Sequence, residues 1–259
     1  MMHEKDRAAA YALRGDALLE GTPQDFLPFL REPGHVVSLV GGGGKTTLMY
    51  HLASCFAAQG FRTAVMTTTR IGRPKDACGT IEDCRARWAA GEIAVCGEIV
   101  GEGKFRAPGE ETLRSLLEQA QAVVIEADGA RRLPCKAPAE HEPVLLPQSD
   151  IVVGVMGLDA LGRRISDVCL RREHVCALLG CGEEHALTPA DMAKILLSGA
   201  GTRKNVAQRD YYIVLNKCDG EGRLEGGREI LSLLREKGHT QAIMTCGMRR
   251  SETYEFHDK

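Results

Sequence analysis

Short apolar runs alternate with amphipathic stretches along most of the chain, a pattern typical of an α/β fold with a largely parallel sheet. The apolar runs predict buried strands over residues 36–40, 63–69, 122–129, 151–157, 211–219 and 241–245. Helices are predicted over residues 46–59, 81–90, 110–120, 188–198 and 226–237. The first helix carries Leu48, Leu52 and Phe56 on one face and ends at Gly60. With its flanking strands it forms a βαβ unit.

Two regions interrupt this alternation. Residues 93–100 and 104–108 flank the short segment Gly101–Gly103, which predicts a small hairpin insertion beside the main sheet. Residues 130–148 contain four prolines and predict a loop.

The beginning of the chain has a broken helical pattern over residues 7–31, where Gly21 stops one helix and Thr22 caps a second, short one. The remainder contains no linker long enough to divide it. We therefore expect an N-terminal helical extension over residues 1–32 and a single α/β domain over residues 33–259.

Composition excludes several function classes. The chain has 259 residues, of which 33 are basic and 35 acidic, so its net charge of −2 predicts no nucleic-acid partner. Its start, MMHEKDRAAA, lacks the apolar core of a secretory signal. The chain contains no stretch of 18 apolar residues, so we expect no membrane partner. The 10 cysteines form no C-x-x-C pair, so we expect reduced thiols and a cytoplasmic location.

The 29 glycines exceed the usual share of about 7%, and four of them stand together between a predicted strand and a predicted helix. This loop consists of Gly41, Gly42, Gly43, Gly44, Lys45, Thr46 and Thr47. Glycines let backbone N–H groups approach a phosphate at the positive end of a helix. Lys45 is predicted to neutralise the outer phosphates, and the Thr46 hydroxyl to bind Mg²⁺.

The loop is shorter than the standard G-x-x-x-x-G-K-[ST] motif, because the first glycine of that motif would fall on Leu39. Its length matches the G-x-x-G-K-T spacing of ATP-using Mur-type ligases. The loop therefore predicts nucleotide binding and favours ATP by its length.

Acidic residues end the third buried strand, over residues 122–129. Glu126 and Asp128 lie on the same face, at the carboxyl edge where open α/β sheets bind ligands. One of them is predicted to hold Mg²⁺ or to position the attacking water. Arg131 and Arg132 follow closely and are candidates for stabilising charge on the phosphates.

A second motif favours guanine. Asn216, Lys217 and Asp219 form the N-K-x-D pattern after a strand, in which the carboxylate accepts from guanine N1–H and N2–H₂ and the lysine stem packs along the base. The segment 245–247 ends the last strand, where GTPases place a second base-contacting loop. The order of motifs thus favours GTP over ATP, whereas the length of the glycine loop favours ATP.

The proline-rich loop also carries candidate chemistry. Lys136, Glu140, His141 and Glu142 provide a base, acids and an imidazole, and so predict a possible substrate loop. Cys135 is a thiol that such a site would use to carry sulfur or selenium, if it is exposed. A second set of cysteines and histidines has gaps too irregular for an ordinary metal site: Cys169, His174, Cys176, Cys181 and His185.

Four segments resemble the YqeC family, known as selenium-dependent hydroxylase accessory proteins: VVSLVGGGGKTT, AVMTTTRI, VIEADGARRLPCKAPAEHEPVLL and VVGVMGLDALG. The resemblance runs from about Pro33 to Met248, and its most specific part is ADGA-x-x-x-P-x-KAPAEHEP. It implies a role in maturing selenium-dependent molybdenum hydroxylases, with selenophosphate-producing and molybdopterin-handling partners. Cys135 stands where an aliphatic residue is expected, and the stretch before Pro33 is additional.

The sequence thus predicts a P-loop NTPase-like α/β protein that binds Mg²⁺ and GTP or ATP and hydrolyses the nucleotide slowly. One alternative is an ATP-dependent ligase or kinase that activates a carboxylate or selenium species, with Lys136 and His141 at the acceptor. The other is a non-enzymatic carrier of a molybdopterin or selenium species, with a degenerate nucleotide site.

Overall fold

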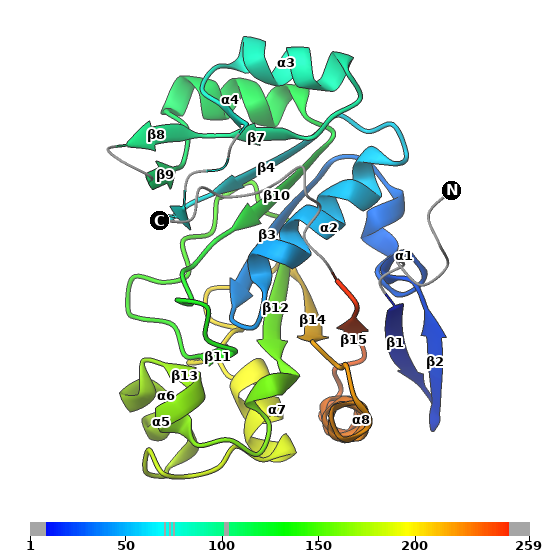
Figure 1. Cartoon of the computed structure of the whole chain (residues 1–259), viewed down its shortest axis with the longest axis vertical. Coiled ribbons are helices and arrows are strands. Elements are labelled where there is room, and N and C mark those ends of the chain that lie inside the picture. The colour runs from blue at the N-terminus through cyan, green and yellow to red at the C-terminus, as the bar shows by residue number, and fades with distance from the viewer. Residues whose placement is uncertain (1–8, 70, 73, 75, 101–103, 249–259) are drawn as a thin grey trace.

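A ten-stranded sheet forms the centre of the computed structural model, which describes residues 9–69, 71, 72, 74, 76–100 and 104–248 (Figure 1). In spatial order the strands are β2 (Ala17–Gly21), β1 (Ala9–Arg14), β15 (Ala242–Cys246), β14 (Asp210–Asn216), β12 (Ile151–Gly157), β3 (His35–Gly41), β10 (Ala122–Glu126), β4 (Thr63–Thr67), β7 (Ala94–Cys96) and β6 (Ala77–Cys78). All pairs from β15 to β6 are parallel. The predicted fold class, a mostly parallel sheet flanked by helices, is therefore confirmed.

Helices cover both faces of the sheet. One face packs against α2 (Lys45–Ala57), α1 (Pro23–Phe26) and η2 (Pro28–Arg31). The other packs against α3 (Ile81–Ala89), α4 (Glu110–Gln119), α7 (Pro189–Leu197) and α8 (Glu221–Glu236). Because successive strand residues point to opposite faces, Val124 packs on the α2 side while Val123 and Ile125 pack against α3 and α4. The central strands are buried on both faces, which explains their continuous apolar runs.

Strand β3 lies at the point where the connections diverge. The chain passes from β3 through α2 to β4, beyond β10, and later reaches β12 on the other side of β3. Ligands of open α/β sheets bind outside the carboxyl ends of the strands at such a switch point. The glycine loop follows β3 at this edge.

The predicted hairpin insertion is confirmed for residues 98–106, whereas Ala94–Cys96, expected to be part of it, form β7 of the main sheet. Strands β8 (Glu98–Val100) and β9 (Lys104–Arg106) pair antiparallel, and β5 (Ile71–Gly72) joins them in a separate three-stranded sheet. The glycines between β8 and β9 lie outside the described residues. Helix α8 begins at Glu221, five residues before the predicted start at residue 226.

The predicted N-terminal helical extension is wrong. Residues 9–21 form a β-hairpin whose strand β1 pairs antiparallel with β15, so this segment is an edge of the main sheet (Figure 1). The local pattern suggested a helix, but Ala10 and Ala12 alternate into the core, at 0% and 5% exposure. Backbone pairing with β15 decides the conformation, whatever the local propensity. The short helix after Thr22 is confirmed and has a capping box.

Residues 158–179 form a small helical cover that the pattern does not predict. It contains η3 (Leu158–Ala160), α5 (Ile165–Val168), β13 (Cys169–Leu170) and α6 (Arg172–Leu179). Strand β13 pairs in parallel with β11 (Cys135–Lys136), which lies inside the predicted proline-rich loop. The loop is therefore anchored by a short strand pair rather than being entirely irregular.

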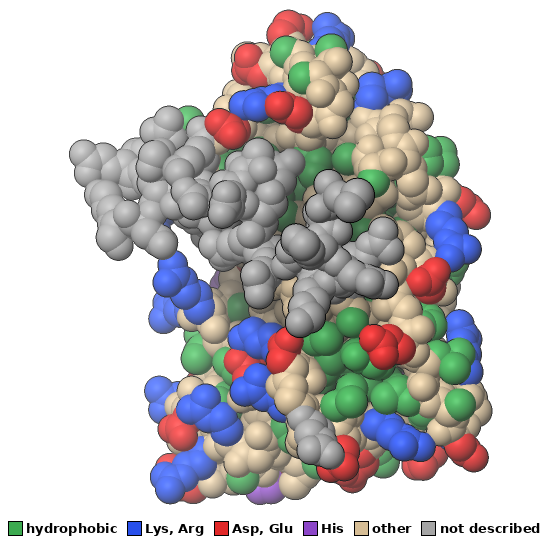
Figure 2. Space-filling view, turned by 45° about the vertical axis from the view of Figure 1, so that its right-hand side comes forward, with side chains coloured by type: hydrophobic (Ala, Val, Ile, Leu, Met, Phe, Trp, Pro, Cys, Tyr) green, Lys and Arg blue, Asp and Glu red, His purple; other side chains and the backbone are tan. Residues whose placement is uncertain are grey.

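Figure 2 shows basic and acidic side chains interspersed on one face of the molecule. Across the described ranges, no helix is both long and apolar enough to cross a bilayer.

The position of β1 predicts a specific stability difference. Replacing Ala10 by Asp buries an unpaired carboxylate in the α1–η2 side of the core and is expected to cost about 3 kcal/mol of unfolding free energy or more. Leu19→Asp, at a position on β2 that is 45% exposed, is the control, with a change of about 0.5 kcal/mol or less. Urea denaturation measures both; equal losses would show that β1 is not part of the folded core.

Candidate functional site

The glycine loop is pressed against its neighbours. Gly43 and Gly44 have φ angles of 79° and 108°, a region that side chains rarely adopt. A Cβ on Gly43 would lie 2.1 Å from the backbone N of Gly157, and one on Gly44 would lie 2.6 Å from Nδ2 of Asn216. Only glycine fits at these two positions.

The amino end of α2 presents free donors. Gly44 is the N-cap and supplies no side chain, and the first helical bond runs from the N–H of Leu48 to the carbonyl of Gly44. Within the described residues, the N–H groups of Lys45, Thr46 and Thr47 have no hydrogen-bond partner. Together with the positive end of the helix dipole they suit a phosphate group.

The two carboxylates after β10 have different partners. Thr46 Oγ1 donates to Glu126 Oε2 at 2.7 Å. Asp128 accepts from the N–H of Gly41 with both oxygens, each at 3.1 Å. The Lys45 ammonium lies 3.1 Å from Asp128 Oδ1 and 3.7 Å from Glu126 Oε1, and donates to the Gly41 carbonyl at 2.7 Å. Both oxygens of Asp128 therefore already have partners inside the protein. Glu126 instead accepts from the Thr46 hydroxyl, which is predicted to bind Mg²⁺.

The contacts of Asp128 continue as a row of charges of alternating sign, buried except for the half-buried Arg171, which we call the charge chain. Its members are Lys45, Asp128, Lys136, Glu142 and Arg171. The Lys136 ammonium lies 3.0 Å from Asp128 Oδ2 and 2.5 Å from Glu142 Oε2, and Arg171 Nη1 lies 2.9 Å from Glu142 Oε2. The chain connects the glycine loop to the proline-rich loop and to the start of α6.

The predicted substrate loop does not converge on one point. Lys136 and Glu142 are buried and pair with each other, while Glu140 and His141 are exposed. Arg131 is exposed as well, and among the described residues no hydrogen bond or ion pair joins it to the glycine loop. The loop therefore divides into an internal pair and a polar outer surface.

The N-K-x-D motif touches the glycine loop directly. Asn216 Nδ2 donates to the Gly43 carbonyl at 2.9 Å, and its Oδ1 accepts from Thr245 Oγ1 at 3.1 Å. Asp219 Oδ1 accepts from the N–H of Gly247 at 3.1 Å. The structure thus brings together the glycine loop, the motif and the end of the last strand, as their order in the sequence suggested.

The sequence patterns do not single out two charged residues near these motifs, Asp159 and Arg171. Asp159 pairs with Lys217 at 2.6 Å and follows β12, so the rule that located Glu126 could have found it. Asp159 and Asp219 also line a hollow of about 470 Å³. Arg171 carries no local signal, because its partner Glu142 is far away in the sequence.

The cysteines offer no accessible chemistry at this edge. Cys135 is fully buried opposite Cys169, and its hydrogen bond with Cys169, together with burial, raises the pKa of its thiol. A reactive thiol at the site is therefore not supported. In the part of the chain that the structure describes, no group of histidines, cysteines and acids is arranged to hold a metal.

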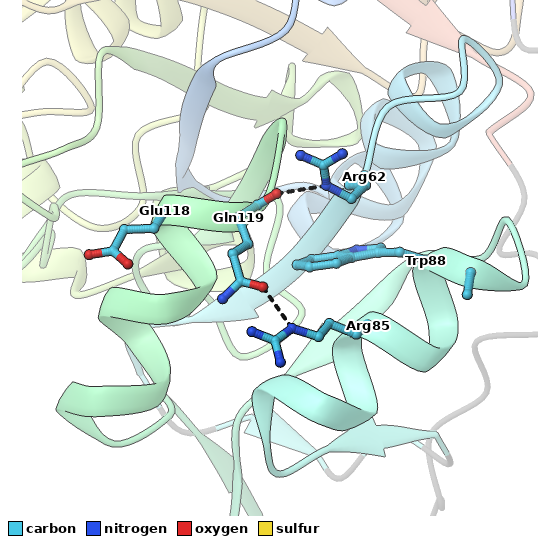
Figure 3. Close-up of a pocket in the computed structure, with 6 residues that line it drawn as sticks. Arg62, Arg85, Trp88, Glu118 and Gln119 are labelled. Atoms are coloured by element: carbon cyan, nitrogen blue, oxygen red, sulfur yellow. Dashed lines mark hydrogen bonds between the residues drawn. The ribbon is translucent and has the colours of Figure 1, made fainter.

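A second hollow lies at the opposite end of the strands (Figure 3). It measures about 460 Å³ and is lined by Arg62, Arg85, Trp88, Ala89, Glu118 and Gln119. Arg62 Nε donates to the Gln119 carbonyl at 2.9 Å and Arg85 Nε to Gln119 Oε1 at 2.8 Å. These bonds fasten the end of α4 to α3 and to the start of β4, which gives both arginines a structural role.

A glycine loop between β3 and α2 at the switch point, with carboxylates on the neighbouring strand, defines a P-loop NTPase-like α/β protein. The chain belongs to the YqeC family, whose model, described as YqeC protein, matches residues 37–173. The uncharacterized protein YqeC of Escherichia coli strain K12 is 30% identical over 184 residues, covering 67% of this chain and 72% of that protein.

Among solved structures, FtsY from Mycoplasma mycoides matches with a TM-score of 0.41 and 14% identity. The match covers 86% of this chain and 63% of FtsY, so this chain spans less than two thirds of that length. The residues that the family model matches include the glycine loop and the whole charge chain, but not the N-K-x-D motif.

The charge chain predicts acid sensitivity. Burial opposes ionisation of Glu142, but the hydrogen bond and charge of Lys136 and the charge of Arg171 outweigh it and lower the pKa of Glu142. The stability contributed by the ionised form is present at neutral pH and is lost as the pH falls through this lowered pKa. We expect Glu142→Gln to cost about 2–4 kcal/mol at pH 7, and less at pH 3.

Urea denaturation at pH 7 and pH 3 measures this difference, with Glu140→Gln on the exposed part of the same loop as the control. A cost of Glu142→Gln that stays the same at both values would contradict the role of the charged form.

Proposed function

We propose that this protein binds a Mg²⁺–nucleotide, with GTP favoured over ATP, hydrolyses it slowly, and acts as an accessory factor in maturing selenium-dependent molybdenum hydroxylases. The main support is the contact between Asn216 and Gly43, which joins a base-reading motif to a phosphate-type loop. The free N–H groups at the start of α2 provide the donors that a triphosphate needs.

Lys45, the N–H groups of Thr46 and Thr47, and the glycine backbone are the proposed phosphate ligands. Lys45 is 3% exposed, donates to the Gly41 carbonyl and forms an ion pair with Asp128, so its ammonium would turn from Asp128 toward a phosphate oxygen. Arg131 lies exposed in the segment after Asp128 and is a candidate for adding charge at the outer phosphate.

Thr46 and Glu126 are the proposed metal ligands, because a hydroxyl and a carboxylate 2.7 Å apart at a helix start suit an oxygen-preferring ion. Mg²⁺ bound there would neutralise charge on the phosphate oxygens. Asp128, whose oxygens are already occupied, is assigned to holding Gly41 and Lys45 rather than to the metal.

Asp219 is the proposed guanine acceptor. Its Oδ1 accepts from the N–H of Gly247, which orients the carboxylate, and each of its oxygens still has a lone pair for one of the two guanine donors. Asn216 joins the motif to Gly43, and Lys217 packs beside the base while paired with Asp159.

The proposed accessory role is based on membership of the YqeC family and on the role that the resemblance to this family implies. A molybdenum hydroxylase or the selenium and molybdenum cofactor machinery of the cytoplasm is the proposed partner. The exposed part of the proline-rich loop, with Glu140 and His141, is the surface of the site that such a partner would meet.

The short glycine loop favours a second candidate, an ATP-dependent ligase or kinase that activates a carboxylate or selenium species. The burial of Lys136 between two carboxylates weighs against its use at an acceptor, and leaves His141 for that role. Stoichiometric release of phosphate without an acceptor would support the hydrolase over the ligase. Failure to bind either nucleotide with Mg²⁺ would favour a non-enzymatic carrier.

Thermal unfolding with GTP, ATP and their diphosphates, with and without Mg²⁺, tests the proposal. At 100 times Kd, a nucleotide adds about 2.7 kcal/mol, or roughly 5–10 °C in Tm for a chain of this size. We expect Lys45→Ala to remove this shift and Lys104→Ala, on the exposed surface of β9, to preserve it. An unchanged shift in Lys45→Ala would overturn the proposed phosphate site.

The base preference is tested separately by Asp219→Asn. An amide cannot accept from both guanine donors, so GTP affinity is expected to fall by about tenfold or more while xanthosine triphosphate binds more tightly. Calorimetric titration measures both nucleotides, with Glu229→Gln on the exposed side of α8 as the control. Unchanged GTP affinity in Asp219→Asn would remove the argument for guanine.

A further inference from the structure

Asp128 lies between two lysines in the interior of the protein. Its side chain is 2% exposed, and the ammonium groups of Lys45 and Lys136 lie 3.1 Å and 3.0 Å from its two oxygens. The same two oxygens accept from the N–H of Gly41, so the carboxylate also fixes the first residue of the glycine loop.

Phosphate binding disturbs this arrangement. The Lys45 ammonium donates to the Gly41 carbonyl and forms an ion pair with Asp128, so turning it toward a phosphate weakens its pairing with Asp128. A buried carboxylate that loses its cation is strongly unfavourable, because neither water nor another charge replaces the lost interaction. Without a second cation, Asp128 would hold Lys45 back from the phosphate.

Lys136 is built to remain with Asp128. Lys136 donates to Glu142 Oε2 at 2.5 Å and to the Gly129 carbonyl at 2.8 Å, and its ammonium forms an ion pair with Asp128 at 3.0 Å. These three partners hold the buried ammonium between the two carboxylates. Arg171 pairs with Glu142 from the far side and so keeps that carboxylate balanced.

We propose that Lys136 is a positioning residue of the phosphate site. It holds Asp128 on the N–H of Gly41 while Lys45 turns from Asp128 to the phosphate. The inference rests on the proposed function and replaces the acceptor role that the sequence suggested for Lys136. It also gives the proline-rich loop, which carries Lys136, a direct influence on nucleotide affinity.

The test measures the Kd for Mg²⁺–GTP by calorimetric titration in a cycle of variants. In Lys136→Met, Asp128 keeps Lys45 as its only cation, and we expect affinity to fall by about 10- to 100-fold. In Lys136→Met/Asp128→Asn, the neutral amide no longer holds Lys45, so affinity is expected to equal that of Asp128→Asn alone. The two losses are therefore expected not to add.

Lys204→Met is the matched control. Lys204 donates to the Ala139 and Glu140 carbonyls, so it also fastens the proline-rich loop but contacts no carboxylate of the charge chain. We expect its effect on Kd to stay within about twofold. An equal loss in both variants would show that Lys136 acts only by holding the loop, and would overturn the inference.

The outcomes distinguish failure of the proposed nucleotide binding from failure of the role of Lys136 alone. If the wild type binds no Mg²⁺–nucleotide, the proposed function fails and the inference fails with it. If the wild type binds and Lys136→Met binds equally well, only the inference is overturned. Should Lys136→Met fold poorly, the comparison of Asp128→Asn with the double variant decides: a further loss in the double variant contradicts action through Asp128.

Discussion

The carboxylate of Asp128 joins two neighbouring strands of the sheet at their carboxyl ends. It follows β10, yet it holds the N–H of Gly41, the last residue of β3, with both oxygens. Such a buried charge is tolerated because Lys45 and Lys136 lie about 3 Å away on either side. The position of the glycine loop, the direction of the Lys45 side chain and the path of the proline-rich loop all depend on this one group.

Contacts that begin at Asp128 and the glycine loop connect segments that are far apart in the sequence. The charge chain passes through Lys136 and Glu142 to Arg171, at the start of α6. On the other side of the loop, Asn216 connects Gly43 to the last two parallel strands. A change in the partners of Lys45 therefore acts directly on the proline-rich loop, since Lys136 belongs to it. The proline-rich loop, which carries the most specific part of the resemblance to the YqeC family, is thus linked physically to the glycine loop.

Much of the fold was predictable, and the failures have identifiable causes. The central strands are buried on both faces, so their apolar runs were unmistakable. The hairpin at residues 9–21 was mistaken for helix on its local pattern, and only pairing with β15 makes Ala10 and Ala12 part of the core. Within the site, Lys136 and Glu142 looked like members of an exposed polar loop. Their burial follows from partners just after β10 and just before α6, Asp128 and Arg171, that no local pattern reveals.

The sequence by itself determined the chemical groups and the edge of the sheet at which they gather, because residue types, glycine spacing and strand order are local properties. It also determined the motif order, from the glycine loop through the acids to N-K-x-D. Only the tertiary structure decided which carboxylate meets Thr46, which lysines share Asp128, and which loop residues face inward. Those choices depend on distances between segments and on the cost of burying charge, which are settled only when the whole chain has folded.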